Sequence, residues 1–341
     1  MSIFCEYCEW HCHLGKEQEG YCKMYREEQG KVVEIYPFAW NSFGVTHIES
    51  LPFFHAYPGS RSLLLGSAGC NFDCQYCSNA HVARVNPKSV NLWHLQPEKL
   101  LTKARQSGCH NIVFAINEPT VSWPSLRALG ETAREQGIEM GCMSNGYFTP
   151  RVANEMAETF SFINISLKAM NRDFYQRYIR VTDIAPVLRN IAYLAEHTHL
   201  EITTPIIQGL NDGDIPSAAS FIASQDPEIP WHVFRLLPEY QMKDMLAPSI
   251  EAIEYALQEQ ENKLAYIYFG NFVGSEWVNT VCPDCGKVLV ERINLGGCGA
   301  KSLACHLQGD CCPSCGRRLR LLGEWTSWNK GGAQIGKNSS Y

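Results

Sequence analysis

Three closely spaced cysteines have the pattern expected of an iron–sulfur ligand set. Cys70, Cys74 and Cys77 form a C-x3-C-x2-C motif in the segment GSAGCNFDCQYCSN. A loop of this length can turn three thiolates toward one point, and three thiolates suit a [4Fe–4S] cluster with one iron free of protein ligands. An open coordination position is typical of a catalytic metal site. The alternative interpretation is a zinc site that a distant fourth ligand completes.

A second group of cysteines lies near the N-terminus. Cys5, Cys8, Cys12 and Cys22 follow the pattern C-x2-C-x3-C-x9-C. Four thiolates so close in sequence can close a tetrahedral site. A structural zinc ion and an auxiliary iron–sulfur cluster both accept four thiolates, and the spacing does not choose between them.

A third group lies near the C-terminus, where two C-P-x-C-G knuckles contain Cys282, Cys285, Cys312 and Cys315. Paired knuckles of this kind are typical of a zinc ribbon, because the glycine after each pair lets backbone amides turn back toward sulfur. We therefore predict a structural zinc ion here. The other metal-binding residue types of this region fit no site template and are Cys298, Cys305, His306 and Cys311.

Composition places this chemistry in a reducing environment. The chain has 341 residues, of which 16 are cysteines and 45 % are hydrophobic. Such a cysteine content in a cytoplasmic protein indicates metal binding. We see no signal peptide and no apolar run of membrane-spanning length, so we expect a cytoplasmic protein of an anaerobic setting that does not enter a membrane. The net charge of −6 argues against a nucleic-acid partner.

The elements that must position these groups alternate regularly between residues 61 and 270. Apolar runs predict strands, and segments with helical periodicity and proline or glycine punctuation separate them. About six repeats of this alternation predict a parallel sheet covered by helices, either doubly wound or an incomplete barrel. Ligands in both folds bind at the carboxyl ends of the strands. The expected strands cover 61–66, 111–116, 138–144, 161–169, 200–207, 231–237 and 264–270.

The three-cysteine loop, placed after the first strand of this alternation, resembles that of the radical S-adenosylmethionine (SAM) superfamily. The resemblance covers about residues 61–272. It implies an incomplete (β/α)6 TIM-like barrel and a cluster whose free iron is chelated by SAM. An electron from that cluster cleaves SAM to methionine and a 5′-deoxyadenosyl radical, which abstracts hydrogen from a substrate. No catalytic side chain beyond the cluster ligands is expected.

The resemblance also implies a set of SAM contacts. They come from the aromatic residue before the third cysteine and from the segments NEP, SNGY, ITTPIIQGLND and WHVFR. Each segment also has a purely structural interpretation, such as a turn or a packed core histidine. The implied contacts are Tyr76, Asn117, Glu118, Ser144, Asn145, Thr203, Gln208 and His232.

The order of these motifs and the terminal cysteine ribbon resemble the pyruvate formate-lyase activating enzyme-like branch. Within that branch, the sequence is most similar to the AmmeMemoRadiSam system radical SAM enzymes. The chain departs from the branch at Ser166, where members carry an aspartate that helps to hold a monovalent cation. The loss of this carboxylate removes one anionic ligand from such a site.

The resemblance implies flavodoxin or ferredoxin as the electron donor and leaves three hypotheses for function. The first is an oxidoreductase that acts on a small molecule, and the second is an activase that installs a glycyl radical on a partner enzyme. The third is a non-catalytic zinc-ribbon interaction protein. The expected parts are an N-terminal Cys-rich segment, the barrel, a zinc-ribbon-like module and a flexible tail, at residues 1–60, 61–272, 273–325 and 326–341.

Overall fold

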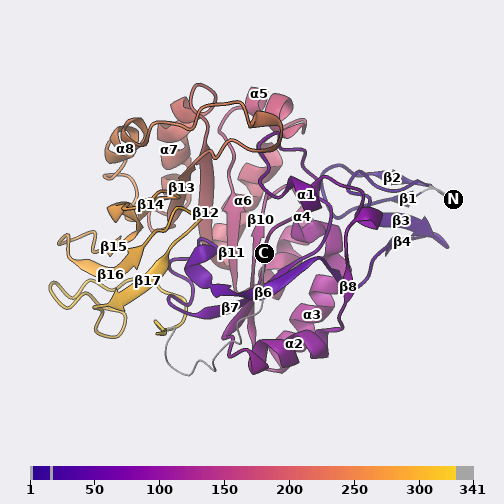
Figure 1. Cartoon of the computed structure of the whole chain (residues 1–341), viewed down its shortest axis with the longest axis horizontal. Coiled ribbons are helices and arrows are strands. Elements are labelled where there is room, and N and C mark those ends of the chain that lie inside the picture. The colour runs from indigo at the N-terminus through magenta and orange to yellow at the C-terminus, as the bar shows by residue number, and fades with distance from the viewer. Residues whose placement is uncertain (1–2, 16–17, 328–341) are drawn as a thin grey trace.

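The computed structural model describes residues 3–15 and 18–327, so most of the expected tail at 326–341 lies outside the described residues. Its centre is an eight-stranded sheet with the order β14-β13-β12-β11-β10-β9-β7-β6 (Figure 1). Seven neighbouring strands are parallel, and β6 pairs antiparallel with β7 at one edge. The strands are β6 Ser42–His47, β7 Arg61–Gly66, β9 Asn111–Phe114, β10 Glu139–Ser144, β11 Phe162–Ser166, β12 His199–Ile206, β13 Trp231–Arg235 and β14 Ile267–Gly270.

Each crossover between consecutive parallel strands contains one main helix. The structure therefore has six β/α units and a seventh parallel strand, and its edge strands β6 and β14 do not pair with each other. This arrangement confirms the predicted α/β class and is consistent with an open barrel. The helices are α2 Pro97–Gln106, α3 Trp123–Glu135, α4 Pro150–Thr159, α6 Ala185–His197, α7 Ile215–Gln225 and α8 Ile250–Gln258, with short helices α1 Ala80–Ala83 and α5 Arg172–Phe174.

Local sequence explains where these helices begin. Five of them, α2, α3, α4, α6 and α7, have proline in the first two positions, where its fixed φ favours the helix and its missing N–H is not needed. Thr149 caps α4, because its hydroxyl accepts a hydrogen bond from the Val152 amide at 3.4 Å. Ser249 caps α8 in the same way through the Ala252 amide at 3.2 Å.

The two faces of the sheet differ in polarity. Alternate residues point to opposite faces, and directly paired residues share a face. Ser166, Thr203, His232 and Tyr268 form one such row across β11 to β14. Ile202 and its neighbours on the other face belong to the large apolar core that the helices cover. The polar row therefore lies on the face that the helices leave free.

Residues 48–57 pack against the same face of the sheet, and one carboxylate holds them there. The buried Glu201 accepts hydrogen bonds from the amides of residues 54–56 at 2.9–3.1 Å. His232 Nε2 also lies 2.6 Å from this carboxylate. Burial acts to raise the pKa of Glu201, but the hydrogen bonds from His199 and His232 hold that pKa well below its usual range. Glu201 therefore remains charged and connects this segment to the sheet.

A three-stranded antiparallel module follows the barrel, with β15 Thr280–Val281, β16 Val288–Ile293 and β17 Lys301–Cys305. The buried Arg292 attaches it to the segment 48–57. Its guanidinium lies 4.3 Å from the Phe54 ring centroid and donates to the Phe54 carbonyl at 2.9 Å. The guanidinium also donates to Thr280 Oγ1 at 2.6 Å, so one side chain joins the two parts.

Two small hairpins form the opposite end of the long axis (Figure 1). One pairs β1 Ile3–Phe4 with β2 His13–Leu14, and the other pairs β3 Tyr25–Glu28 with β4 Lys31–Glu34. A further short pair joins β5 Ala39–Trp40 to β8 Trp93–His94. The segment 1–60 thus also contributes a strand, β6, to the central sheet.

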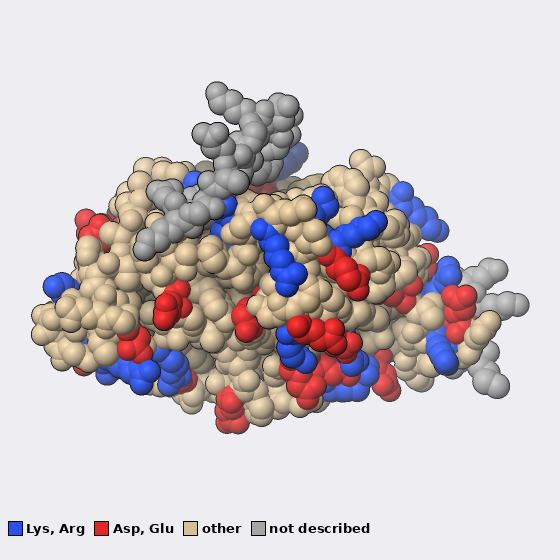
Figure 2. All heavy atoms as spheres, turned by 90° about the horizontal axis from the view of Figure 1, so that it is seen from below, with Lys and Arg blue, Asp and Glu red and all other residues tan. Residues whose placement is uncertain are grey.

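The surface carries both signs of charge. On the face that Figure 2 shows, lysine and arginine lie among aspartate and glutamate, and neither sign forms a continuous field. None of the helices within the described ranges combines the length and the apolar character that a bilayer crossing requires.

The Glu201 network predicts a pH-dependent contribution to stability. Because the folded pKa is depressed, this contribution is present above the unfolded value near 4.5 and is lost as the pH falls toward the folded pKa. We expect Glu201→Gln to lower the free energy of unfolding by about 3 kcal/mol at pH 7 and by less in acid. Urea denaturation at several pH values measures this. Glu196→Gln, at an exposed position of α6, is the control, and an equal loss for both variants would contradict the assignment.

Candidate functional site

The three-cysteine loop lies at the carboxyl end of β7, the first parallel strand, and leads into α1. Two backbone bonds fix its middle to the turn around residue 178, from Asp73 N to the Ile179 carbonyl at 3.1 Å and from Gln75 N to the Tyr178 carbonyl at 2.9 Å. Burial raises the pKa of the Cys74 thiol to about 12. A metal that binds there must therefore displace the thiol proton.

Asn117, at the end of β9, shapes the first half of this loop. Its carbonyl oxygen accepts from the Ser67 amide at 2.9 Å, and its amide donates to Ser67 Oγ at 3.0 Å and to the Gly69 carbonyl at 2.9 Å. Gly69 needs this support, since its φ of +79° is favourable only for glycine. The side chain of Asn117 is therefore committed to the loop, and it acts on the site by holding Cys70 in place.

The carboxylate of Glu118 accepts hydrogen bonds from the next two predicted residues along the chain. It accepts from Ser144 Oγ at 2.9 and 3.0 Å and from the Asn145 amide at 2.9 Å. It also accepts from Thr120 Oγ1 at 3.1 Å. Burial raises the pKa of Glu118, although these hydrogen bonds act in the opposite direction. Glu118 thus joins the ends of β9 and β10 beside Cys70, whose sulfur is 3.9 Å from the side-chain Nδ2 of Asn145.

Three further predicted residues have buried polar atoms without a partner among the described residues. These atoms are the Tyr76 hydroxyl, Thr203 Oγ1 and His232 Nδ1. Nearly all buried polar atoms in folded proteins make hydrogen bonds, so unpaired ones are candidates for ligand contacts. Their chemistry suits SAM, which carries polar groups on its amino acid, ribose and adenine.

Gln208 differs from the other predicted contacts. The other seven are buried, whereas Gln208 is exposed, and its Oε1 accepts from the Ser249 amide at the start of α8 at 3.1 Å. The structure therefore places this side chain at a helix start and apart from the buried group. Gln208 lies in a loop between a strand and a helix, and the sequence of such a loop does not indicate where its side chains point.

Two residues near the loop were not predicted. The Lys168 ammonium acts to lower the pKa of both Cys74 and Cys77, so it lies within electrostatic range of both thiols. Asn71 Oδ1 accepts from the side-chain Nδ2 of Asn145 at 2.6 Å and from the Cys70 thiol at 3.9 Å. Their positions, at the end of a strand and directly after a cluster cysteine, are the signals that could have identified them.

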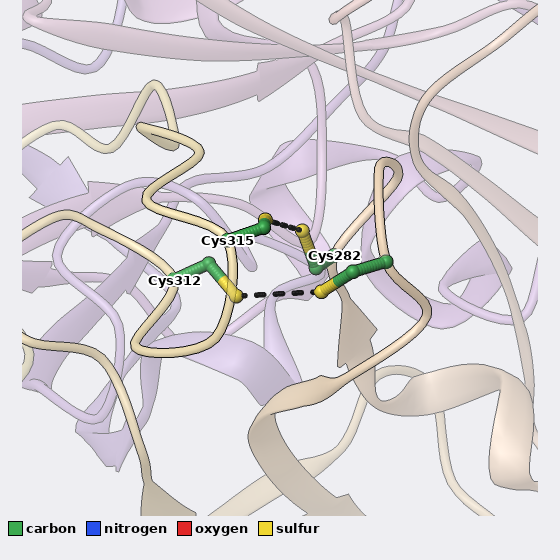
Figure 3. A group of neighbouring side chains, drawn as sticks. Cys282, Cys312 and Cys315 are labelled. Atoms are coloured by element: carbon green, nitrogen blue, oxygen red, sulfur yellow. Dashed lines mark hydrogen bonds between the residues drawn. The ribbon is translucent and has the colours of Figure 1, made fainter.

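The C-terminal cysteines form a compact ligand group. The sulfur atoms of Cys282, Cys285, Cys312 and Cys315 all lie within 4.8 Å of one another. The two knuckles face each other in Figure 3, with Cys282 and Cys315 sulfurs 3.5 Å apart and Cys285 and Cys312 sulfurs 3.6 Å apart. A tetrahedral ion with metal–sulfur bonds of 2.3 Å separates its sulfurs by about 3.8 Å. The group therefore has the dimensions of a site for one ion.

The other residues of the C-terminal module form no such group within the described part of the chain. His306 Nε2 lies 2.8 Å from Glu291, and the Cys311 thiol donates to Asp310 at 3.4 Å. Cys298 is exposed and Cys305 is half-buried.

The N-terminal cysteines share one small cavity. Cys5, Cys8, Cys12 and Cys22 all line it, together with Asn71 from the three-cysteine loop. Burial raises the pKa of Cys5 to about 11 and that of Cys8 to about 12. The N-terminal group thus meets the three-cysteine loop inside the molecule.

Comparisons with known proteins agree with this geometry. Residues 64–222 match the Radical SAM superfamily. An uncharacterised protein of Methanocaldococcus jannaschii is 29 % identical, over 94 % of this chain and 96 % of its own length. The GTP 3′,8-cyclase of Pseudomonas putida (strain W619) is 25 % identical over 47 % of this chain and 49 % of its own, so the similarity covers about half of that enzyme.

A solved structure supports the fold independently. Streptococcus suis SuiB bound to the precursor peptide SuiA matches with a TM-score of 0.50 and 12 % identity, over 63 % of this chain and 48 % of that one. The family match includes the complete three-cysteine loop and most of the β/α units. Residues 64–222 therefore match the radical SAM superfamily, and these findings support a radical SAM enzyme.

The role of Asn117 can be tested by removing its side-chain amide. We expect Asn117→Ala to lower the iron content by as much as one cluster, about four atoms per chain. The reason is that each buried loop group left without a partner costs about 1–3 kcal/mol. Iron analysis after anaerobic purification measures this. Asn154→Ala, at an exposed position of α4, is the control. Full iron content in both variants would show that the hydrogen bonds of Asn117 to the loop are dispensable.

The compact C-terminal group predicts the metal that it binds. We expect about one zinc ion per chain at this group, because its sulfur spacing suits a tetrahedral ion. Cys285→Ser should remove that zinc and leave the iron content unchanged. Cys305→Ser, outside the group, should keep both metals. Loss of iron instead of zinc from Cys285→Ser would refute the assignment.

Proposed function

We propose that the protein cleaves SAM reductively to methionine and a 5′-deoxyadenosyl radical, which abstracts hydrogen from a substrate. The supporting observation is the combination of the three-cysteine loop, which includes the unpaired Tyr76 hydroxyl, with the unpaired polar atoms of Thr203 and His232 on the face of the sheet that the helices do not cover. Three protein thiols leave a fourth iron position open, and a ligand with several polar groups would complete the unpaired atoms.

The residues divide this work between them. Cys70, Cys74 and Cys77 would hold a [4Fe–4S] cluster, which when bound supplies the electron for cleavage. Glu118 fixes the ends of β9 and β10, and the half-buried Lys168 provides a positive charge near the thiolates. Glu201 holds the Nε2 side of the His232 ring and leaves Nδ1 for a ligand.

The face where the radical would form is well separated from solvent. Thr203 and His232 are 6 % and 1 % exposed, and the segment 48–57 packs on the same face. A closed site of this kind keeps water and unrelated side chains away from a reactive intermediate.

We also assign the chain to the pyruvate formate-lyase activating enzyme-like branch, close to the AmmeMemoRadiSam system enzymes. The order of the NEPT, SNGY, SLK, IIQGLND and WHVFR segments along the sheet supports this assignment. The hydrogen donor is either a small molecule or a glycine of a partner enzyme. A glycyl-radical doublet in the electron paramagnetic resonance spectrum of a co-expressed partner would identify the second case.

The same chemistry supports a proposal for the electron donor and the compartment. A flavodoxin or ferredoxin would supply the low-potential electron. None of the 16 cysteines, all of which lie within the described residues, forms a disulfide, and thiols available to bind metals suit the reducing, cytoplasmic and anaerobic setting that we propose.

The proposed reaction predicts that a single thiol of the loop is indispensable. We expect Cys74→Ala to abolish the formation of 5′-deoxyadenosine from SAM under dithionite, because two thiolates cannot retain the open cluster. Chromatography of the anaerobic reaction measures the product. Cys109→Ala, a cysteine outside the three groups, should retain wild-type cleavage. Unchanged cleavage by reconstituted Cys74→Ala would exclude this loop as the cluster site.

A further inference from the structure

The N-terminal cysteines are spaced differently from those of the C-terminal group. All four C-terminal sulfurs lie within 4.8 Å of one another. Within the described residues, no three of the N-terminal sulfurs meet this limit, although all four cysteines line one cavity. The sulfurs of the three-cysteine loop do not meet it either. Neither the N-terminal group nor the loop therefore has the compact sulfur arrangement of the C-terminal group.

Sulfur spacing distinguishes a single ion from a cluster. Thiolates on one tetrahedral ion stand about 3.8 Å apart. Thiolates on a multi-iron cluster bind different iron atoms and stand further apart, because the metal core separates them. The wider arrangement of the N-terminal thiols thus suits an iron–sulfur cluster better than a zinc ion.

The N-terminal group also contacts the loop directly. The Asn71 side chain hydrogen-bonds the Cys8 thiol on one side and accepts from the Cys70 thiol at 3.9 Å on the other. Trp10 Nε1 donates to the Asn71 carbonyl at 2.7 Å. One asparagine therefore lies between a cysteine of each group.

A second contact joins the two groups through the backbone. Gly69 precedes Cys70 and touches the carbonyl of Cys22, so closely that a Cβ at Gly69 would lie 2.8 Å from that oxygen. The side of the N-terminal group that faces the loop is thus in van der Waals contact with it.

The N-terminal cysteines differ in their exposure to solvent. Cys5 and Cys8 are 5 % and 9 % exposed, whereas Cys12 and Cys22 are only half-buried. A group bound by all four thiols would be reachable from the surface through Cys12 and would face the loop through Cys8.

We propose that Cys5, Cys8, Cys12 and Cys22 bind an auxiliary iron–sulfur cluster that relays electrons to the cluster of the three-cysteine loop. This relay rests on the proposed SAM cleavage. A low-potential one-electron donor protein would be oxidised and the auxiliary cluster, when bound, would be reduced. The same electron would pass across the Asn71 contact to the loop cluster and would break the sulfonium–carbon bond of SAM. One electron is thus consumed for each SAM cleaved, and no proton is transferred in the relay.

The first test is metal content combined with the choice of reductant. We expect about eight iron atoms per wild-type chain and about four in Cys8→Ser. The ratio of turnover driven by reduced flavodoxin to turnover driven by dithionite should fall at least tenfold in Cys8→Ser, because dithionite can reduce the loop cluster directly. Cys109→Ala should match the wild type in both measurements. About four iron atoms and two zinc ions in the wild type would overturn the proposal.

A second measurement uses the unmodified holoenzyme, in case Cys8→Ser does not fold. Two reduced clusters in contact through one asparagine should broaden each other's electron paramagnetic resonance signals by magnetic coupling. A spectrum of a single isolated cluster would overturn the relay. The outcomes remain separable from the proposed function, because SAM cleavage with one cluster refutes only the relay. Two coupled clusters without SAM cleavage would refute the proposed reaction instead.

Discussion

The site depends on one constraint, which is that the loop after β7 must keep a single conformation. Three thiols separated by only two or three residues can serve one cluster only if the backbone between them is fixed. Asn117 supplies this restraint from the neighbouring strand, through three hydrogen bonds to Ser67 and Gly69. The parallel pairing of β7 with β9 brings the carboxyl ends of the two strands together, and this places Asn117 next to the loop.

The same geometry explains why the remaining parts lie where they do. Glu118 follows Asn117 and connects β9 to β10, while Glu201 connects β12 to the segment 48–57. Both are buried carboxylates surrounded by donors, and each holds a backbone turn that apolar packing alone would leave free. The chain thus uses buried acids as fixed acceptors.

Much of this arrangement could be predicted from the sequence. Apolar runs such as 111–116 and 231–237 contain the observed strands β9 and β13, because buried parallel strands require continuous apolar residues. The strand β6 was not predicted, since an edge strand with one exposed side has a weaker pattern. The sequence did not identify Asn71, and it did not indicate the contact of Gln208 with the start of α8, for a related reason. The direction of a loop side chain depends on tertiary contacts, and neither periodicity nor spacing encodes those contacts.

Arg292 connects the C-terminal module to a part of the molecule outside that module. It is the buried cation that ties β16 to the Phe54 carbonyl and ring. Phe54 itself belongs to the segment 48–57, and its backbone amide donates to Glu201, which also contacts His232. Arg292 therefore links the C-terminal module, through Phe54, to the segment that lies beside His232. Metal binding by the C-terminal cysteines would thus be coupled thermodynamically to the order of the segment 48–57.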